Sequence, residues 1–342
     1  MTPKKLKVLI LTLLLVVFGA TSALAQVGTT VYNHIPTPLP PNVPSLGFQA
    51  NQTAEFGDNV FLAGTDRRAA TATVTMSDWA LHSTYPSMPA AGFNHPITFN
   101  IYAVDHSGPN PALGALLGSV TQTFLIPWRP EADPLCTGGK WRASDNLCYN
   151  GLAFKITFDL RGLALTLPDD LIFGVAYNTN TWGYHPIGLP GPYESLNVGL
   201  ATGPASVGLD VEPDALFWNT MTAADYADGG AGGVGIFRRD TNWTPYSPAV
   251  QLTALTRDQC KDSLEQKEEA FEKQQKADKK AFDAQSHTKL EKKNFEDLQE
   301  AAEKAFNTQN EADEKQCNQI PKGDKDKDDK KDKDDKDHKD GH

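Results

Sequence analysis

Apolar and polar side chains alternate with a period of two in several stretches between residues 31 and 255. This alternation places every second side chain on one face of a β-strand, so that one face is buried and the other meets solvent. The stretch 171–177 is instead apolar at nearly every position, which is typical of a central strand covered on both faces. The alternating rows are Ala72, Val74 and Met76; Ile97, Phe99, Ile101 and Ala103; Phe154, Ile156 and Phe158; and Val250, Leu252 and Ala254.

Links rich in proline and glycine separate these strands, and no helical periodicity of useful length interrupts them. About ten short strands with turns between them favour a mainly β fold. We therefore predict one domain over residues 26–255, built as an antiparallel two-sheet sandwich of the jelly-roll type. A closed barrel is the alternative.

Residues 257–317 contain neither glycine nor proline and are rich in Glu, Lys, Gln and Ala, which predicts helix. Thr256 and Thr288 each begin a capping box, and these boxes mark two helix starts. Three pairs of residues lie equally far from a centre near position 288: Cys260 with Cys317, Phe271 with Phe306, and Phe282 with Phe295. We predict an antiparallel helical hairpin over residues 256–318, roughly 40 Å long. One continuous helix that pairs with a second chain through two intermolecular disulfides satisfies the same symmetry.

The first 25 residues resemble an export signal. Three lysines up to Lys7 precede a short apolar run over residues 8–18, and Ala23-Leu24-Ala25 forms a small-residue cleavage site. The run is too short to span a membrane. We expect cleavage before Gln26 and a secreted or cell-surface protein.

Four cysteines in an exported chain favour two disulfides over metal ligation. Cys136 and Cys148 lie in one loop and pair most simply with each other. Cys260 and Cys317 then remain, in agreement with the mirrored helical segment.

The chain carries a net charge of −11, and both the β-rich part and the helical part are acidic. A negative field disfavours nucleic acid as a partner.

Residues 319–342 are almost entirely Asp and Lys and are expected to be a disordered tail. The glycine-rich stretch 229–235 lacks the lysine of a phosphate loop, and the histidines are scattered, so we expect no cofactor and no metal.

The best candidate for ligand binding is the loop 181–193, which carries Trp182, Tyr184, His185 and Tyr193 among prolines and glycines. Flat rings on a loop held by a rigid scaffold could stack on a sugar, so the expected partner is a glycan or another cell-surface ligand. The alternative is that Trp182 and Tyr193 cover the end of the core, because aromatic side chains bury large areas.

Paired carboxylates would instead indicate a hydrolase that acts on polysaccharides, since glycoside hydrolysis needs two of them at one bond. Asp210 and Glu212 are two residues apart and would share one face of a strand. Glu131 and Glu194 are further candidates. A calcium site at Asp58, Asp66, Glu131 or Asp133 is possible in principle, although no EF-hand spacing supports it. A purely structural envelope protein with no ligand is the third hypothesis.

Several short motifs resemble those of secreted bacterial β-sandwich proteins of unassigned function. The residues are 45–50, 55–58, 63–67, 74–79, 195–200 and 243–251. The resemblance covers about residues 31–255 and none of the helical part. It implies an extracellular β-sandwich and brings no reaction and no ligand residues.

Overall fold

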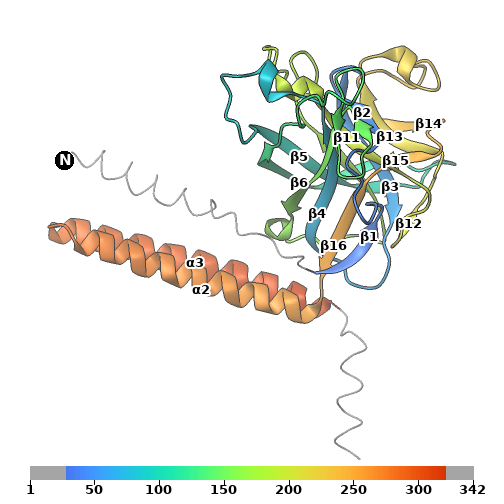
Figure 1. Cartoon of the computed structure of the whole chain (residues 1–342). Helices are drawn as coiled ribbons and strands as arrows, with labels where there is room; N and C mark the ends of the chain where they lie inside the picture. The colour runs from blue at the N-terminus through green and yellow to red at the C-terminus, as the bar shows by residue number, and fades with distance from the viewer. Residues whose placement is uncertain (1–27, 321–342) are drawn as a thin grey trace, which may run out of the picture.

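The computed structural model describes residues 28–320, which form a β-rich body and a long helical arm that projects from it (Figure 1). The expected export signal and all but the first two residues of the expected tail lie outside the described residues. The strands precede both long helices along the chain, and every strand pairing is antiparallel. The prediction of a mainly β fold followed by C-terminal helices is therefore confirmed.

The first sheet has seven strands in the order β1-β16-β4-β11-β15, with β2 beside β11 and β9 beside β4. Its strands are β1 (Thr29–Asn33), β2 (Ser45–Gly47), β4 (Arg68–Asp78), β9 (Leu152–Asp159), β11 (Leu196–Thr202), β15 (Tyr246–Pro248) and β16 (Val250–Leu255).

The second sheet also has seven strands, in the order β14-β13-β3-β10-β5-β6, with β12 beside β3. Its strands are β3 (Thr53–Phe61), β5 (Phe93–Asp105), β6 (Ala112–Ile126), β10 (Asp170–Ala176), β12 (Leu209–Asp210), β13 (Ala215–Thr220) and β14 (Arg238–Thr241). A small hairpin of β7 (Trp141–Arg142) and β8 (Cys148–Tyr149) is closed by the Cys136–Cys148 disulfide. Short 3-10 helices are η1 (His82–Thr84), η2 (Arg161–Leu163), η3 (Pro192–Ser195) and η4 (Ala223–Asp225).

One hydrophobic core draws side chains from both large sheets. Phe99 on β5 and Phe124 on β6 both contact Phe158 on β9, with ring centroids 5.5 and 4.8 Å apart. The predicted row of Ile97, Phe99 and Ile101 is fully buried in this core. Strand β10 lies between β3 and β5 and is buried along most of its length, so the prediction of a central strand there is confirmed.

Strand β4 departs from the alternation expected of it, because its threonine face is buried as well as its apolar face. It is a central strand, flanked by β9 on one side and by β16 and β11 on the other. Hydroxyl pairs across the sheet satisfy two of its threonines, Thr71 with Thr253 at 2.7 Å and Thr73 with Thr157 at 2.9 Å, whereas the Thr75 hydroxyl and the Asp78 Oδ2 atom are buried without a hydrogen-bond partner in the structure. Threonine suits a fully buried strand when its hydroxyl has such a partner.

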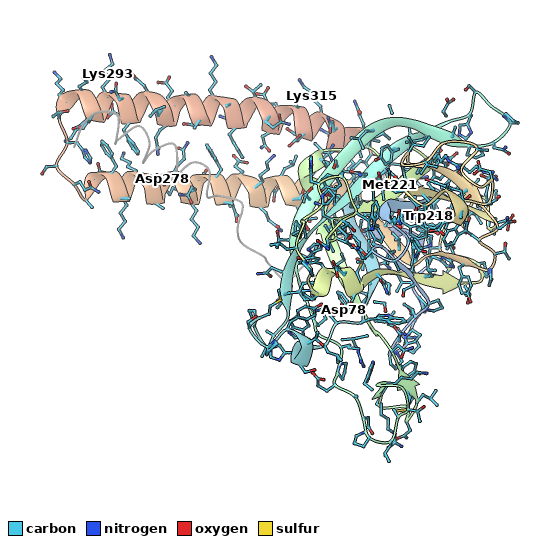
Figure 2. All side chains as sticks on the ribbon, turned by 90° about the horizontal axis from the view of Figure 1, so that it is seen from above. Asp78, Trp218, Met221, Asp278, Lys293 and Lys315 are labelled. Carbon is cyan, nitrogen blue, oxygen red and sulfur yellow. A yellow bond between two sulfur atoms is a disulfide. The ribbon has the colours of Figure 1, made fainter. Side chains whose placement is uncertain are left out.

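The arm consists of α2 (Arg257–Asp283) and α3 (Lys289–Gln319), and both predicted capping boxes are present. Stacked rings join the helices at two levels: Phe271 on Phe306 at 4.1 Å and Phe282 on Phe295 at 4.2 Å between centroids. The Cys260–Cys317 disulfide closes the base within one chain. All three mirrored pairs therefore come together within one chain, as in the predicted hairpin. In Figure 2, Asp278 and Lys293 lie far out on the arm and Lys315 lies near the body.

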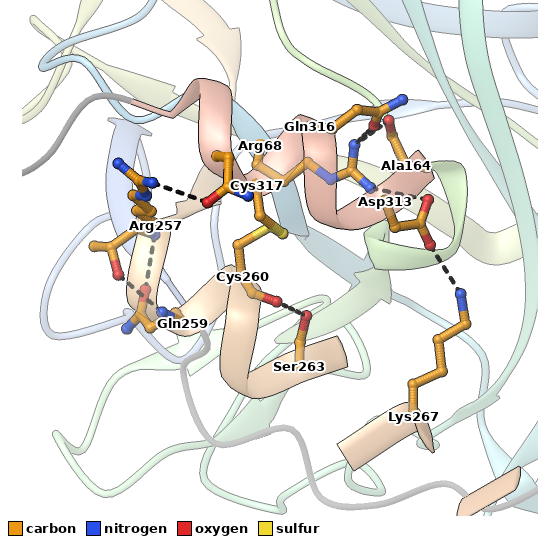
Figure 3. The surroundings of a disulfide bond; sticks show 12 residues. Arg68, Ala164, Arg257, Gln259, Cys260, Ser263, Lys267, Asp313, Gln316 and Cys317 are labelled. Carbon is orange, nitrogen blue, oxygen red and sulfur yellow. Dashed lines mark hydrogen bonds and ion pairs between the residues drawn. A yellow bond between two sulfur atoms is a disulfide. The ribbon is translucent and has the colours of Figure 1, made fainter. Parts of the chain in front are cut away.

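The base of the arm packs on the first sheet (Figure 3). Cys260, Cys317 and Ile320 form an apolar cluster with Ala70 and Leu255 of the body. Both ends of the hairpin therefore lie at the body, and the chain has returned there by residue 320. The hairpin is therefore an arm that projects from the body, and the turn between α2 and α3 is its outer end.

An ion-pair network fixes the direction of this arm. Arg68 on β4 lies 3.8 Å from Asp313 on α3, and both side chains are buried, while Lys267 on α2 approaches the same carboxylate to 2.9 Å. The Arg68 guanidinium also donates hydrogen bonds to the carbonyl of Ala164 and to Gln316. Burial lowers the pKa of Arg68, and Asp313 opposes that shift.

Replacing Asp313 with Ala is expected to destabilise the protein by about 3 kcal/mol, because it leaves the buried charge of Arg68 without its counterion. Urea unfolding of the full chain measures this change. The double variant Arg68→Met with Asp313→Leu is the control, since it removes both charges and should recover most of the loss. Equal stability of the wild type and the single variant would show that the ion pair does not hold the arm.

Candidate functional site

A row of residues that are partners in strand register crosses the second sheet on the face turned away from the core. Asn219 on β13 lies opposite Glu55 on β3, which lies opposite Ala176 on β10, and the row continues to Thr98 on β5 and Thr121 on β6. Neighbouring strands hold these side chains side by side, because directly opposed residues on one face are in contact distance. Polar groups thus flank a small residue in the middle of the row.

Small residues at the centre leave a hollow of about 360 Å³ in this face. Ala176 forms part of its lining, and Gly174 lies two residues before it on β10, on the same face of the strand. A Cβ atom at Gly174 would come within 2.1 Å of the Glu55 Oε1 atom, so the glycine allows the Glu55 side chain to cross β10. The lining residues are Ala54, Glu55, Thr98, Asn100, Ser119, Thr121, Ala176, Tyr184 and Asn219.

Glu55 is the charged group of the hollow. Its Oε1 atom accepts hydrogen bonds from the Asn100 amide at 2.8 Å and from the Tyr102 hydroxyl at 2.9 Å. Burial raises the pKa of the Glu55 carboxyl above its usual value, and the two hydrogen bonds partly offset that rise. Neither bond uses Oε2, so the carboxylate keeps acceptor capacity for a ligand.

Further hydrogen-bonding groups line the walls. Thr98 and Thr121 share a hydrogen bond at 2.8 Å, and Ser119 donates one to the Asn100 oxygen at 2.7 Å. The Oδ1 atom of Asn219 is buried and has no hydrogen-bond partner in the structure.

The loop predicted to bind a ligand reaches the rim of this hollow through Tyr184. The Tyr184 hydroxyl lies 3.2 Å from the Thr98 hydroxyl, and the side chain is 51% exposed. His185 is exposed, and its ring lies beside that of Tyr184 at 5.1 Å between centroids. An exposed ring beside a polar hollow can stack on a flat apolar face of a ligand.

The other two aromatic candidates lie elsewhere. Tyr193 stacks on His95 at 5.5 Å between ring centroids and packs against the core, as the structural alternative expected for it. Burial lowers the pKa of that histidine to about 4. Trp182 is half-buried, and its carbonyl accepts a hydrogen bond from the Thr179 amide at 2.8 Å. Of the four residues predicted from the loop, only Tyr184 lines the hollow.

The carboxylates considered for a hydrolase do not converge on one site. Glu212 forms a bidentate pair with Arg239, with both contacts at 2.7 Å. Asp210 instead hydrogen bonds to Ser247, and burial raises its pKa. Glu131 accepts hydrogen bonds from the amide and hydroxyl of Ser83. Asp210 and Glu212 lie near each other, as their spacing suggested, and the Glu212 amide donates a hydrogen bond to Asp210 Oδ1 at 3.1 Å. Arg239 already neutralises Glu212, however, and neither carboxylate lines the hollow at Glu55.

Glu194 and the residues considered for calcium form neither a catalytic pair nor a metal site among the described residues. The Oε1 atom of Glu194 is buried without a partner, and its charge helps to raise the pKa of Tyr85. Asp58 is buried, and burial together with the nearby Asp210 raises its pKa well above the usual value. Within residues 28–320, no group of three or more His, Cys, Asp or Glu side chains could hold a metal ion.

A larger hollow of about 680 Å³ lies at the edge of the second sheet, beside Phe61 and Leu209. Its charged side chains, Arg67 and Asp169, are already paired with each other at 2.7 Å. Because its charges are satisfied internally, this hollow offers fewer groups for recognition than the smaller one. We therefore take the hollow at Glu55 as the candidate site.

Sequence reasoning missed Glu55, Asn100 and Asn219. One signal for the hollow is present in the printed sequence, because Gly174 and Ala176 are the small residues of an otherwise bulky apolar strand. Alternate positions share one face, so two small residues there indicate a depression in that face.

Comparison with protein families, with curated proteins and with solved structures finds no match for this chain. The resemblance to secreted β-sandwich proteins therefore stays a prediction. No helix within residues 28–320 is long and apolar enough to cross a membrane.

Proposed function

We propose that this is a secreted, non-catalytic protein whose body is a two-sheet β-sandwich that binds carbohydrate in the hollow at Glu55. The shared core between the two sheets supports the sandwich. The basic and apolar start of the chain and the two disulfides support export to an oxidising compartment.

The observation that carries the proposal is the position of one exposed aromatic ring beside a polar hollow. Tyr184 can stack on the apolar face of a sugar ring, while Glu55, Asn219 and Thr98 can exchange hydrogen bonds with its hydroxyls. A volume of about 360 Å³ is at the lower end of the range for small-ligand sites, about 300–1,000 Å³. A site of this composition recognises a small, hydroxyl-rich ligand.

A hydrolase that acts on polysaccharides is the less favoured function. Among the described residues that line the hollow, Glu55 is the one carboxylate, whereas hydrolysis of a glycosidic bond needs two.

The variant Tyr184→Ala is expected to weaken oligosaccharide binding about tenfold, because loss of a stacking aromatic removes on the order of 1.4 kcal/mol. Glycan-array screening of the full chain would identify the ligand, and calorimetric titration would then measure the loss. Tyr246→Ala is the matched control, since this tyrosine is also exposed but lies on the first sheet. Equal binding by both variants, or no binding by the wild-type protein to any glycan, would contradict the proposal.

A further inference from the structure

The carboxylate of Glu55 is the charged acceptor of the hollow. Its side chain crosses β10, and its Oε1 atom accepts hydrogen bonds from Asn100 and Tyr102 on β5. Neither bond uses the Oε2 atom, so the carboxylate can accept from a ligand group that donates several hydrogen bonds at once.

The charge of Glu55 has no counterion in the hollow. Among the described lining residues there is no Lys, Arg or His. Its hydrogen bonds come from the Asn100 amide and the Tyr102 hydroxyl, both of which are neutral donors. A half-buried carboxylate without a cation is costly, and a cationic group on the ligand would relieve that cost.

The other polar groups of the lining are neutral. They include the hydroxyls of Thr98, Thr121 and Ser119, and the ring of Tyr184 stands at the rim. Hydroxyls both donate and accept, so they suit the hydroxyls of a sugar ring rather than a second charged group. The hollow thus combines one anionic group with neutral hydroxyls.

We infer that the ligand is an amino sugar with a free amine, whose ammonium group binds the Glu55 carboxylate while its ring hydroxyls face the threonines. This inference rests on the proposed carbohydrate-binding function and names the class of sugar. An ammonium offers three donors and a positive charge, and the Glu55 carboxylate offers a free acceptor and the opposite charge. A uronic acid would place a second negative charge beside Glu55, and an N-acetyl group would replace the cation with a neutral amide.

Titration calorimetry with the full chain tests the inference with four tetrasaccharides, made of glucosamine, N-acetylglucosamine, glucose and a uronic acid. Glucosamine is expected to bind about tenfold more tightly than glucose, because charge-assisted hydrogen bonds are stronger than neutral ones. The uronic acid should bind most weakly. Affinity for glucosamine should rise and then fall with pH, because binding needs both an ionised Glu55 and a protonated amine, whereas affinity for glucose should not.

The variant Glu55→Gln should bind glucosamine and glucose equally, since it keeps an acceptor for Asn100 and removes the charge. Glu131→Gln, which alters a carboxylate outside the hollow, should keep the full preference.

The inference is overturned if the wild-type protein binds glucose or the uronic acid as well as glucosamine, or if Glu55→Gln keeps the preference for glucosamine. In those cases sugar binding itself, and with it the proposed function, still stands. If no tetrasaccharide binds, both fail. Should the variant not fold, the four wild-type affinities and their pH dependence decide the question.

Discussion

Replacing Asp78 with Asn is expected to make the protein progressively more stable than the wild type as the pH rises from about 4 to about 8. At the lower pH the two proteins should have almost equal free energies of unfolding. At the higher pH the free energy of unfolding of the variant should be larger by several kcal/mol, since each unit of pKa shift corresponds to about 1.4 kcal/mol. Urea unfolding of both proteins across this range measures the difference.

The reason is that burial raises the pKa of Asp78 from 3.8 to about 8. The side chain is fully buried, and its Oδ2 atom has no hydrogen-bond partner. A group whose pKa is raised on folding contributes stability that is complete below the unfolded pKa and is lost as the pH rises through the folded pKa. The asparagine side chain of the variant would be neutral at every pH and could still accept the hydrogen bond from the Ala80 amide.

The variant Asp105→Asn is the control for this prediction. Asp105 is exposed, and hydrogen bonds from Ser107 lower its pKa, so its loss should give no gain in stability at alkaline pH. A stability difference between Asp78→Asn and the wild type that stays constant with pH would contradict a protonated, buried Asp78.

Removing the disulfide at the base of the arm has the second large expected effect. The double variant Cys260→Ala with Cys317→Ala should lose about 4 kcal/mol of stability in the arm, because the bond closes a loop of 57 residues. The arm has few apolar contacts besides its two phenylalanine levels, so its helices depend on that closure. Thermal melting of the helical circular dichroism signal measures the change.

The double variant Cys136→Ala with Cys148→Ala is the matched control, since its disulfide closes 12 residues in the body. It should leave the melting of the helices unchanged. If the helices melt at the same temperature with and without the Cys260–Cys317 bond, the ion pair and apolar cluster at the base are sufficient to hold the arm.

The arm and both disulfides could be predicted from the sequence because the signals are local or symmetric. Phe271 with Phe306 and Phe282 with Phe295 repeat one spacing about one centre, and a fold at that centre brings them together within one chain. Several strands could be predicted for the same reason, since the alternation of apolar and polar side chains is a pattern of neighbouring residues. What the pattern could not show was that Ile320 returns to the body, because that contact depends on docking against Leu255.

The hollow depends on strand register, which no local pattern specifies. Glu55 and Asn219 come together only because β13 pairs with β3 in one particular alignment. The aromatic loop was located by its composition, yet composition could not tell Tyr184, which reaches the hollow, from Tyr193, which packs on His95. Loop residues separate in this way because tertiary contacts, rather than propensity, decide which ring is buried.

Chemical-shift mapping by NMR of the full chain, titrated with the tightest-binding oligosaccharide, tests the central claim most directly. The account predicts that the shifted backbone amides cluster at Glu55, Thr98, Asn100, Gly174–Ala176 and Tyr184. Shifts that cluster instead around Phe61 and Leu209, at the larger hollow, would contradict it.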